Sequence, residues 1–117
     1  MNLDDYQIKA ARTMKPAHYN TPYLALGLAG EAGEYADLVK HEQFHGHPED
    51  NDKAAEELGD ALWYLSCAAL ERGFTLSTIA ERNLAKLLVR YPHGFTEKES
   101  ISGKGGHREL DLGENLT

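Results

Sequence analysis

The sequence is nearly free of cysteine: Cys67 is the only one, so no disulfide can form within the chain. A lone cysteine favours a reducing compartment, and we expect a cytoplasmic protein in which Cys67 is a small core residue rather than a reactive thiol. No apolar run approaches the roughly 18 residues of a membrane span, so no membrane partner is expected. The opening residues, MNLDDYQIKAART, have no apolar segment of the secretory type, which predicts that there is no signal peptide.

Basic residues are also scarce, with 12 Lys and Arg against 19 Asp and Glu and a net charge of −7. This balance argues against a nucleic-acid polymer as the main partner. The acids are concentrated, because residues 31–60 hold ten of them against only Lys40 and Lys53, a local charge of −8. Carboxylates gathered in this way repel one another and are stabilised by a cation.

With 117 residues, the chain is expected to form one domain built around a modest core. No segment alternates with a two-residue period, whereas apolar residues recur with helical spacing. Helix-start signals lie at Thr21-Pro22, at Asp50 or Asp52 and at Thr75, and stop signals lie at Gly73 and Pro92. The pattern predicts helices over residues 4–15, 22–43, 52–72 and 76–91. The residues of the last helix that are predicted to point inward are Leu76, Ile79, Leu84, Leu87 and Leu88.

These elements predict an all-α protein, an antiparallel four-helix bundle to which the N-terminal helix makes a short contribution. After Phe95 the composition changes to polar residues and glycine. We therefore divide the chain into a domain, residues 1–95, and an extended polar C-terminal tail, residues 96–117, with one short strand around Ser100–Ile101.

Two pairs of acids interrupt the apolar stripes of the second and third predicted helices. Glu31 and Glu34 are three residues apart, as are Glu57 and Asp60, so each pair shares a helix face. Glu31 lies three residues from Leu28 and four from Tyr35, which places it on the apolar stripe rather than on the solvent side.

Burying carboxylates without partners costs several kcal/mol each, unless a divalent cation lies between them. All-carboxylate sites suit hard ions, which favours Mg²⁺, with Mn²⁺ as a substitute. The alternative, that these pairs are ordinary solvated acids, is weakened by their position on two apolar stripes.

Three histidines lie near the end of the second predicted helix. His41 and His45 have the i, i+4 spacing of a zinc pair, and His47 follows in the polar segment HGHPEDND. Because no cysteine ligand is near, we interpret them as surface histidines, with a loop that controls substrate access as the alternative.

The fourth predicted helix carries Asn83, Lys86 and Arg90 at i, i+3 and i+7, on one face. An amide, an ammonium and a guanidinium along one edge suit a polyphosphate with a base or sugar, although the same pattern also describes a solvated face. The aromatic residues Trp63, Tyr64 and Tyr91 could stack on a base or simply belong to the core.

Four sequence blocks in this order resemble the MazG-like all-α nucleoside triphosphate pyrophosphohydrolases: YQIKAART, LGLAGEAGE, EELGDALWYL and NLAKLLVRYP. The family pattern is Glu-x-x-Glu, a spacer and Glu-x-x-Asp; here EAGE and ELGD are separated by 22 residues. The resemblance covers about residues 6–95.

The resemblance implies Mg²⁺-dependent hydrolysis of a nucleoside triphosphate to the monophosphate and pyrophosphate, in nucleotide pool sanitation or control. It implies that a small-molecule nucleotide is the substrate and that the protein is a homo-oligomer, a dimer or a tetramer. The implied metal ligands are Glu31, Glu34, Glu57 and Asp60, and Glu34 is our choice for the carboxylate that activates water. The residues implied to contact substrate are Asn83, Lys86, Tyr64 and, from its place on the same helix face, Arg90.

Gln7 and Arg12 match the first-helix signature without a defined role. Two alternatives stay open at this point: an enzyme of the same fold that acts on phosphoribosyl-ATP, and a non-enzymatic helical module whose cation holds an oligomer together.

Overall fold

The computed structural model describes residues 1–18 and 20–101, in two compact units, Met1–Leu76 and the segment from Ser77 onward, each of which is described by itself. The described residues are helical and contain no strand, apart from an isolated bridge between Pro92 and Gly94. This confirms the predicted all-α class. The helices are α1 (Leu3–Ala11), the 3-10 turn η1 (Pro16–His18), α2 (Thr21–Phe44), α3 (Asn51–Glu71), α4 (Leu76–Arg90) and α5 (Glu97–Ile101).

Local signals determine where the helices begin and end. Asp50 caps α3 by accepting a hydrogen bond from the backbone N–H of Lys53 at 2.9 Å, as predicted. Gly73, with φ +83°, follows the end of α3 and adopts the left-handed conformation that glycine reaches without a Cβ penalty. The start of α2 differs from the prediction, because the cap is Asn20 rather than Thr21.

Thr21 has a tertiary role instead. Its hydroxyl donates a hydrogen bond to Glu71 Oε1 at 2.6 Å, which links the first residue of α2 to the last residue of α3. Asn20 and Thr21 are both good capping residues; Asn20 caps α2, and the Thr21 hydroxyl binds Glu71 instead.

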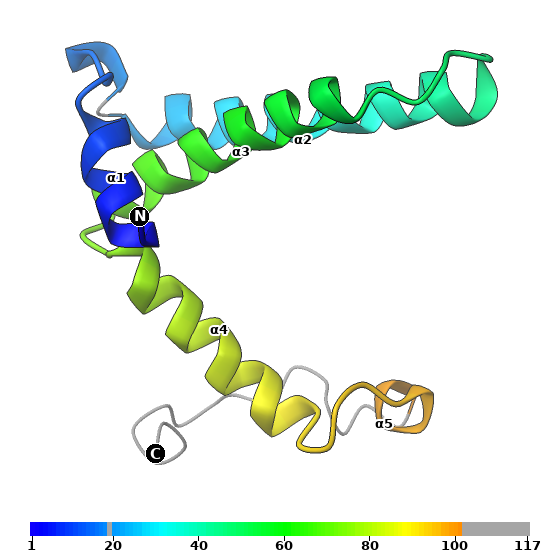
Figure 1. Ribbon diagram of the computed structural model, residues 1–117. Coiled ribbons are helices and arrows are strands. Elements are labelled where there is room, and N and C mark those ends of the chain that lie inside the picture. Colours follow the sequence, from blue (N-terminus) through cyan, green and yellow to red (C-terminus); the bar gives the residue numbers. More distant parts are fainter. Residues whose placement is uncertain (19, 102–117) are drawn as a thin grey trace. The chain divides into compact units, whose positions relative to one another are not determined.

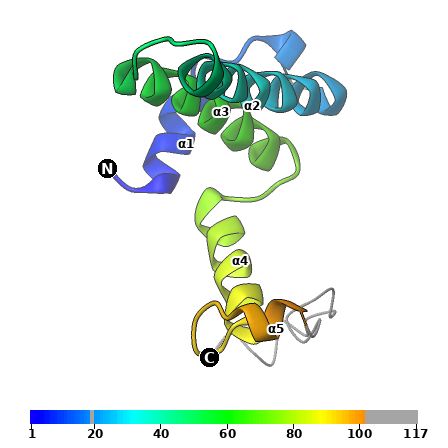
Figure 2. The ribbon, with the colours of Figure 1, turned by 90° about the vertical axis from the view of Figure 1, so that its right-hand side faces the viewer.

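The first unit is organised around α2 and α3, which lie side by side and run in opposite directions (Figure 1). The shorter α1 packs against α3, as Figure 2 shows from the side. Since α4 begins where the second unit begins, the predicted four-helix bundle is not confirmed; the first unit is a two-helix hairpin with α1 packed against it.

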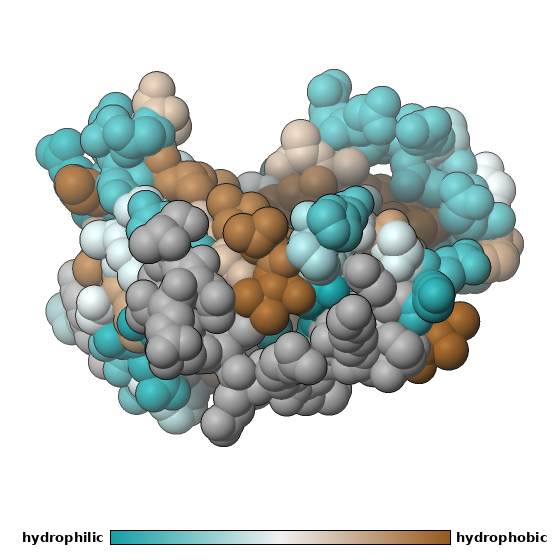
Figure 3. Space-filling model, turned by 90° about the horizontal axis from the view of Figure 1, so that it is seen from below, coloured by the Kyte–Doolittle hydropathy of each residue, from teal (hydrophilic) through white to brown (hydrophobic). Residues whose placement is uncertain are grey.

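The buried core is small for a chain of this length. Leu24 and Cys67 are each 1% exposed, which confirms Cys67 as a core residue, and burial raises the pKa of its thiol. Many large apolar side chains reach the surface, and Figure 3 shows apolar residues exposed among hydrophilic ones.

The residues predicted to point inward from α4 divide into two groups. Leu76 is 4% exposed, as predicted, and Ile79 is partly buried. Leu84 is 65% exposed, Leu87 40% and Leu88 56%, so the inward orientation is wrong for these three leucines in the single chain. Among the described residues of the second unit α4 is the only long helix, and no element of comparable length covers this stripe.

The C-terminal segment begins with a helix. Ser100 and Ile101 lie in α5, so the predicted strand at these residues is wrong. The rest of the predicted tail, residues 102–117, lies outside the described residues. None of the helices in the described part of the chain has the length and apolar character needed to cross a membrane.

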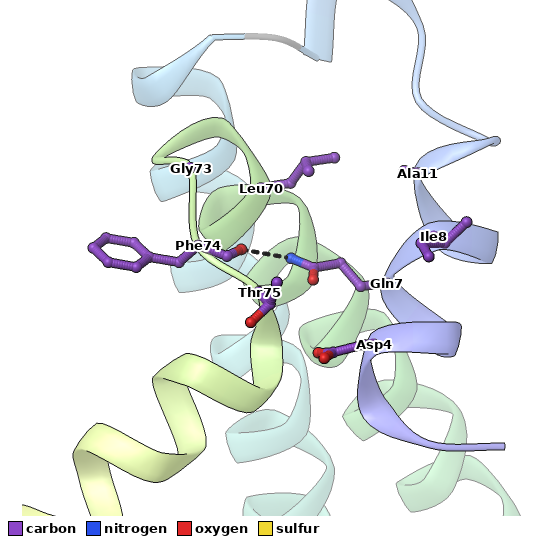
Figure 4. Close-up of a pocket in the computed structure, with 8 residues that line it drawn as sticks. All are labelled: Asp4, Gln7, Ile8, Ala11, Leu70, Gly73, Phe74 and Thr75. Carbon is purple, nitrogen blue, oxygen red and sulfur yellow. Dashed lines mark hydrogen bonds between the residues drawn. The ribbon is translucent and has the colours of Figure 1, made fainter.

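Gln7 fastens α1 to the turn that follows α3 (Figure 4). The side chain is 5% exposed, and its Nε2 donates to the carbonyl oxygens of Ser66 and Phe74 at 3.2 and 3.0 Å. Its Oε1 accepts from the backbone N–H of Leu76 at 3.0 Å. One buried amide therefore satisfies three backbone groups that lie 59 to 69 residues away, which gives this part of the first-helix signature a structural role.

Replacing Gln7 with alanine is expected to lower the free energy of unfolding by about 2–4 kcal/mol, because buried backbone groups then lose their partners. Urea unfolding followed by circular dichroism measures the loss. Gln43→Ala, at an exposed position of α2, is the matched control and should change the free energy by less than about 0.5 kcal/mol. Equal losses in the two variants would contradict the structural role of Gln7.

Candidate functional site

Three carboxylates converge between α2 and α3. Glu31 comes from α2, while Glu57 and Asp60 come from α3, and one oxygen of each lies within 4.8 Å of the others. The i, i+3 spacing puts Glu57 and Asp60 on one face of α3, and the side-by-side packing of the helices brings Glu31 to the same place. We call these three side chains the carboxylate cluster.

The cluster combines burial with like charge. Glu57 is only 8% exposed, and its Oε1 lies 3.2 Å from Nζ of Lys53, one turn earlier on α3. Partial burial raises the pKa of Glu31, and the charges of Asp60, Glu57 and Glu34 raise it further. This is the electrostatic signature of an acidic site that gains stability from a cation.

Glu34, the remaining predicted acid, is exposed and is not one of the three side chains whose oxygens meet. Its charge nevertheless contributes to the raised pKa of Glu31, one turn before it. The predicted roles of Glu34 as a metal ligand and as the water-activating carboxylate stay predictions.

Tyr64 stands beside the cluster and is fitted closely against α2. A hydrogen bond with Tyr23 and partial burial raise the pKa of Tyr64, and the charges of Glu31 and Asp60 raise it further. A Cβ added at Gly27 would lie within 3.0 Å of three atoms of the Tyr64 ring. Glycine at this position therefore lets the tyrosine ring lie directly on the backbone of α2.

Other aromatic rings extend from Tyr64 towards η1. Trp63 lies edge-on to Tyr64 with ring centroids 4.9 Å apart, and its Nε1 donates to Thr13 Oγ1 at 2.8 Å. His18 stacks on Tyr23 at 5.0 Å and meets Trp63 edge-on at 5.5 Å. Sequence reasoning identified Trp63 and Tyr64 but missed His18 and Tyr23, because a loop residue and a first-turn residue carry no helical periodicity.

Lys53 and Gly27 were missed as well. Lys53 is one of only two bases in the acidic stretch and lies four residues before Glu57, and this spacing could have identified it. Nothing in the sequence distinguishes Gly27 from Gly30 and Gly33, at which an added Cβ meets no atom within 4 Å.

The predicted substrate residues of the fourth helix lie in the second unit. Asn83, Lys86 and Arg90 are all on α4, where their spacing places them along one face. The guanidinium carbon of Arg90 lies 6.0 Å from the ring centroid of Tyr91. The ring centroids of Tyr91 and Phe95 are 5.3 Å apart. Their contact with substrate stays a prediction.

A cavity of about 400 Å³ lies elsewhere in the first unit, beside Gln7 (Figure 4). Apolar side chains, including Ile8, Leu70 and Phe74, form most of its wall, and it contains none of the predicted site residues. The cavity and the convergence of acids therefore indicate different places in the first unit, and three carboxylates meet only at the second of these two places.

The donor set of the cluster fits a hard divalent cation. It consists of carboxylate oxygens alone, and the mutual repulsion that raises the pKa of Glu31 is the interaction that a divalent ion removes. The residues present are therefore compatible with Mg²⁺ or Mn²⁺ and less suited to ions that prefer nitrogen or sulfur.

The described part of the chain is thus an all-α protein with an acidic cluster between two long helices. The family model described as the MazG nucleotide pyrophosphohydrolase domain matches residues 20–95, a span that contains the whole cluster. The chain belongs to this family, whose enzymes typically use a divalent metal.

A similar curated protein is the Gene 37 protein of Mycobacterium phage L5. It is 36% identical to this chain over 119 residues, which cover 92% of this chain and 100% of the phage protein. No solved structure matches the chain.

Proposed function

We propose that the protein hydrolyses nucleoside triphosphates to the monophosphate and pyrophosphate with the help of Mg²⁺. The convergence of Glu31, Glu57 and Asp60 inside the region matched by the MazG family carries this proposal. The family supports the reaction class, and the all-oxygen donor set supports the choice of metal.

Glu31, Glu57, Asp60 and Glu34 would hold the ion, and Mn²⁺ would substitute for Mg²⁺. When bound, the ion neutralises triphosphate charge and polarises the phosphoryl group. Within the chain, Glu57 is positioned by burial and by Lys53, whereas Glu34 is exposed one turn from Glu31. We assign Glu34 the orientation and deprotonation of the attacking water, a role that requires its carboxylate to come within hydrogen-bond reach of that water.

On the substrate side we propose roles for Tyr64 and for the polar face of α4. Tyr64 lies beside the cluster, and its ring and hydroxyl suit a base or sugar. Lys86 and Arg90 would bind phosphate oxygens, and Asn83 would bind a polar group of the nucleotide.

We also propose that the protein is a homo-oligomer, a dimer or a tetramer. Large side chains such as Leu26, Leu84 and Leu88 are more than half exposed in the single chain, and association would cover apolar surface of this kind. The buried, unpaired Cys67 is compatible with the cytoplasm as its location.

Pyrophosphate release from a panel of canonical and modified ribo- and deoxyribonucleoside triphosphates tests the function. We expect turnover with Mg²⁺ or Mn²⁺, none with excess chelator, and a rank order of substrates that identifies the preferred base and sugar. The alternative, a non-enzymatic helical module, predicts two results: no nucleotide is turned over, and a chelator dissociates the oligomer of this protein.

A further inference from the structure

Figure 1 shows the end of the α2–α3 hairpin, where α2 passes into the loop before α3. The rings of three histidines of this segment lie close together. His41 lies in the last turns of α2, His45 is its C-cap residue and His47 follows Gly46. The function proposed above does not use this group, which we call the histidine cluster.

The backbone brings the three imidazoles together. The His41 and His45 rings, four residues apart, have centroids 5.0 Å apart, and His47 stacks on His41 at 4.8 Å with 20° between the ring planes. Gly46, at φ +71°, turns the chain back, and the N–H of His47 donates to the carbonyl of His41 at 3.2 Å. The position of His47 over His41 is therefore fixed by the helix end rather than by the side chains alone.

A carboxylate orients the central histidine. Asp37, one turn before His41, has its Oδ2 3.6 Å from His41 Nδ1, while its Oδ1 is paired with Lys40 at 2.9 Å. At 3.6 Å this contact is longer than a hydrogen bond. A small turn of either side chain would give the hydrogen bond from Nδ1 to a carboxylate that is commonly found behind metal-bound imidazoles and that leaves the lone pair of Nε2 available.

The stretch His41 to His45 reads HEQFH, the H-E-x-x-H pattern in which two histidines bind zinc and the glutamate acts as a general base. Here Glu42 is engaged elsewhere, because its Oε2 accepts the backbone N–H of Asp50 at 2.7 Å and so closes the loop before α3. His45 lies at φ −117° and ψ 12°, outside the helix that the hydrolytic motif needs. These observations argue against Glu42 as the base of a zinc hydrolase in this arrangement.

We propose that His41, His45 and His47 form a binding site for a divalent transition-metal ion of the Zn²⁺ type, with Asp37 as the orienting partner of His41. Imidazole nitrogen suits such ions and is a poor ligand for Mg²⁺, so the ligand class differs from that of the carboxylate cluster. The acidic stretch around the site, −8 over residues 31–60, attracts cations to it.

Metal binding requires a local rearrangement of the rings. In the structure, the ring nitrogens of the three histidines do not all come within 4.8 Å of one another. At least one ring therefore has to turn about its side-chain bonds before all three can bind one ion. His45 and His47 are exposed and can turn on the nanosecond timescale without disturbing the core. The proposal does not depend on the hydrolytic function.

Calorimetry tests this site: the full chain, without an added histidine tag, is titrated with Zn²⁺. The solution contains a large excess of Mg²⁺, which occupies carboxylates but binds imidazole poorly. We expect binding of one Zn²⁺ ion that weakens at least about 100-fold in His41→Asn and about 10-fold or more in Asp37→Asn. His47→Asn, in the loop, should weaken binding without affecting folding.

The matched control is His93→Asn, which removes an exposed histidine outside the cluster and should leave Zn²⁺ affinity unchanged. Absence of binding to the unmodified chain would overturn the proposal. Binding that survives in both His41→Asn and His47→Asn would also overturn it, because the ion would then lie elsewhere.

Discussion

Replacing Asp60 with asparagine is expected to reduce pyrophosphate release by about 10²- to 10³-fold, the usual effect of removing one electrostatic contact to a transition state. The change keeps the size of the side chain and removes one charge from the carboxylate cluster. Initial rates at saturating Mg²⁺ and nucleotide measure the effect on kcat.

The same variant should not lose stability in the presence of a chelator. Asp60 is exposed, and its charge helps to raise the pKa of Glu31, so removing that charge relieves repulsion in the metal-free protein. We expect a Tm equal to or above that of the unmodified chain. A fall in Tm in parallel with activity would show that Asp60 acts through folding rather than through the cation.

Glu49→Gln is the matched control for the loss of a negative charge, because Glu49 is an exposed acid in the loop between α2 and α3 and is not part of the carboxylate cluster. It should keep full activity. Glu34→Gln separates the two roles proposed for Glu34: strong loss of turnover with unchanged Mg²⁺ affinity would support the role in activating water and contradict the role as a metal ligand. Full activity of Glu34→Gln would exclude that role.

Replacing Gly27 with alanine is expected to destabilise the protein by about 1–3 kcal/mol, the range for overpacking a fitted contact. The added methyl group would overlap the ring of Tyr64, which has to move away from α2. For a chain of this size each kcal/mol corresponds to a fall of about 4–8 °C in Tm, which a thermal melt followed by circular dichroism resolves.

Gly30→Ala on the same helix is the control, because an added Cβ there meets no atom within 4 Å. It should raise stability by up to about 1 kcal/mol through helix propensity. In a Tyr64→Ala background, Gly27→Ala should no longer lower the free energy of unfolding, since the ring that the added methyl group would overlap is gone. A Gly27→Ala variant as stable as Gly30→Ala in the original background would show that the ring moves aside freely.

Sequence patterns predicted the helices well because the signals that begin and end them are local. Asp50 and Gly73 act through groups within a few residues, so their positions could be identified from the sequence. The strand expected at Ser100–Ile101 is wrong because a single β-branched apolar residue, Ile101, is weak evidence for a strand in so short a segment, and α5 forms there instead.

The arrangement of the site was less accessible from the sequence. Helical spacing showed that Glu57 and Asp60 share a face, but their distance from Glu31 depends on how α2 and α3 are aligned along their length. The sequence therefore grouped four acids where the structure brings the oxygens of three together, with Glu34 one turn beyond.

Burial was predicted least well, because it depends on what covers a residue. The stripe on α4 that includes Leu84 and Leu88 has the periodicity of a core face, yet these leucines are more than half exposed in the single chain. Periodicity identifies a face that can be buried, and the partner that buries it is not encoded in the same helix.

The contact between Lys53 and Glu57 has a consequence for how the cluster responds to its surroundings. The Lys53 ammonium lies 3.2 Å from Glu57, the most buried carboxylate of the cluster, and serves as its counter-ion. Because the two residues are one turn apart on α3, the effective concentration of this ammonium at Glu57 is high. A divalent ion that binds Glu57 competes with this tethered lysine as well as with water. If the cluster binds a divalent ion as proposed, the lysine would act as an internal competitor, and half-occupancy would need a higher concentration of free metal than the carboxylates alone would require.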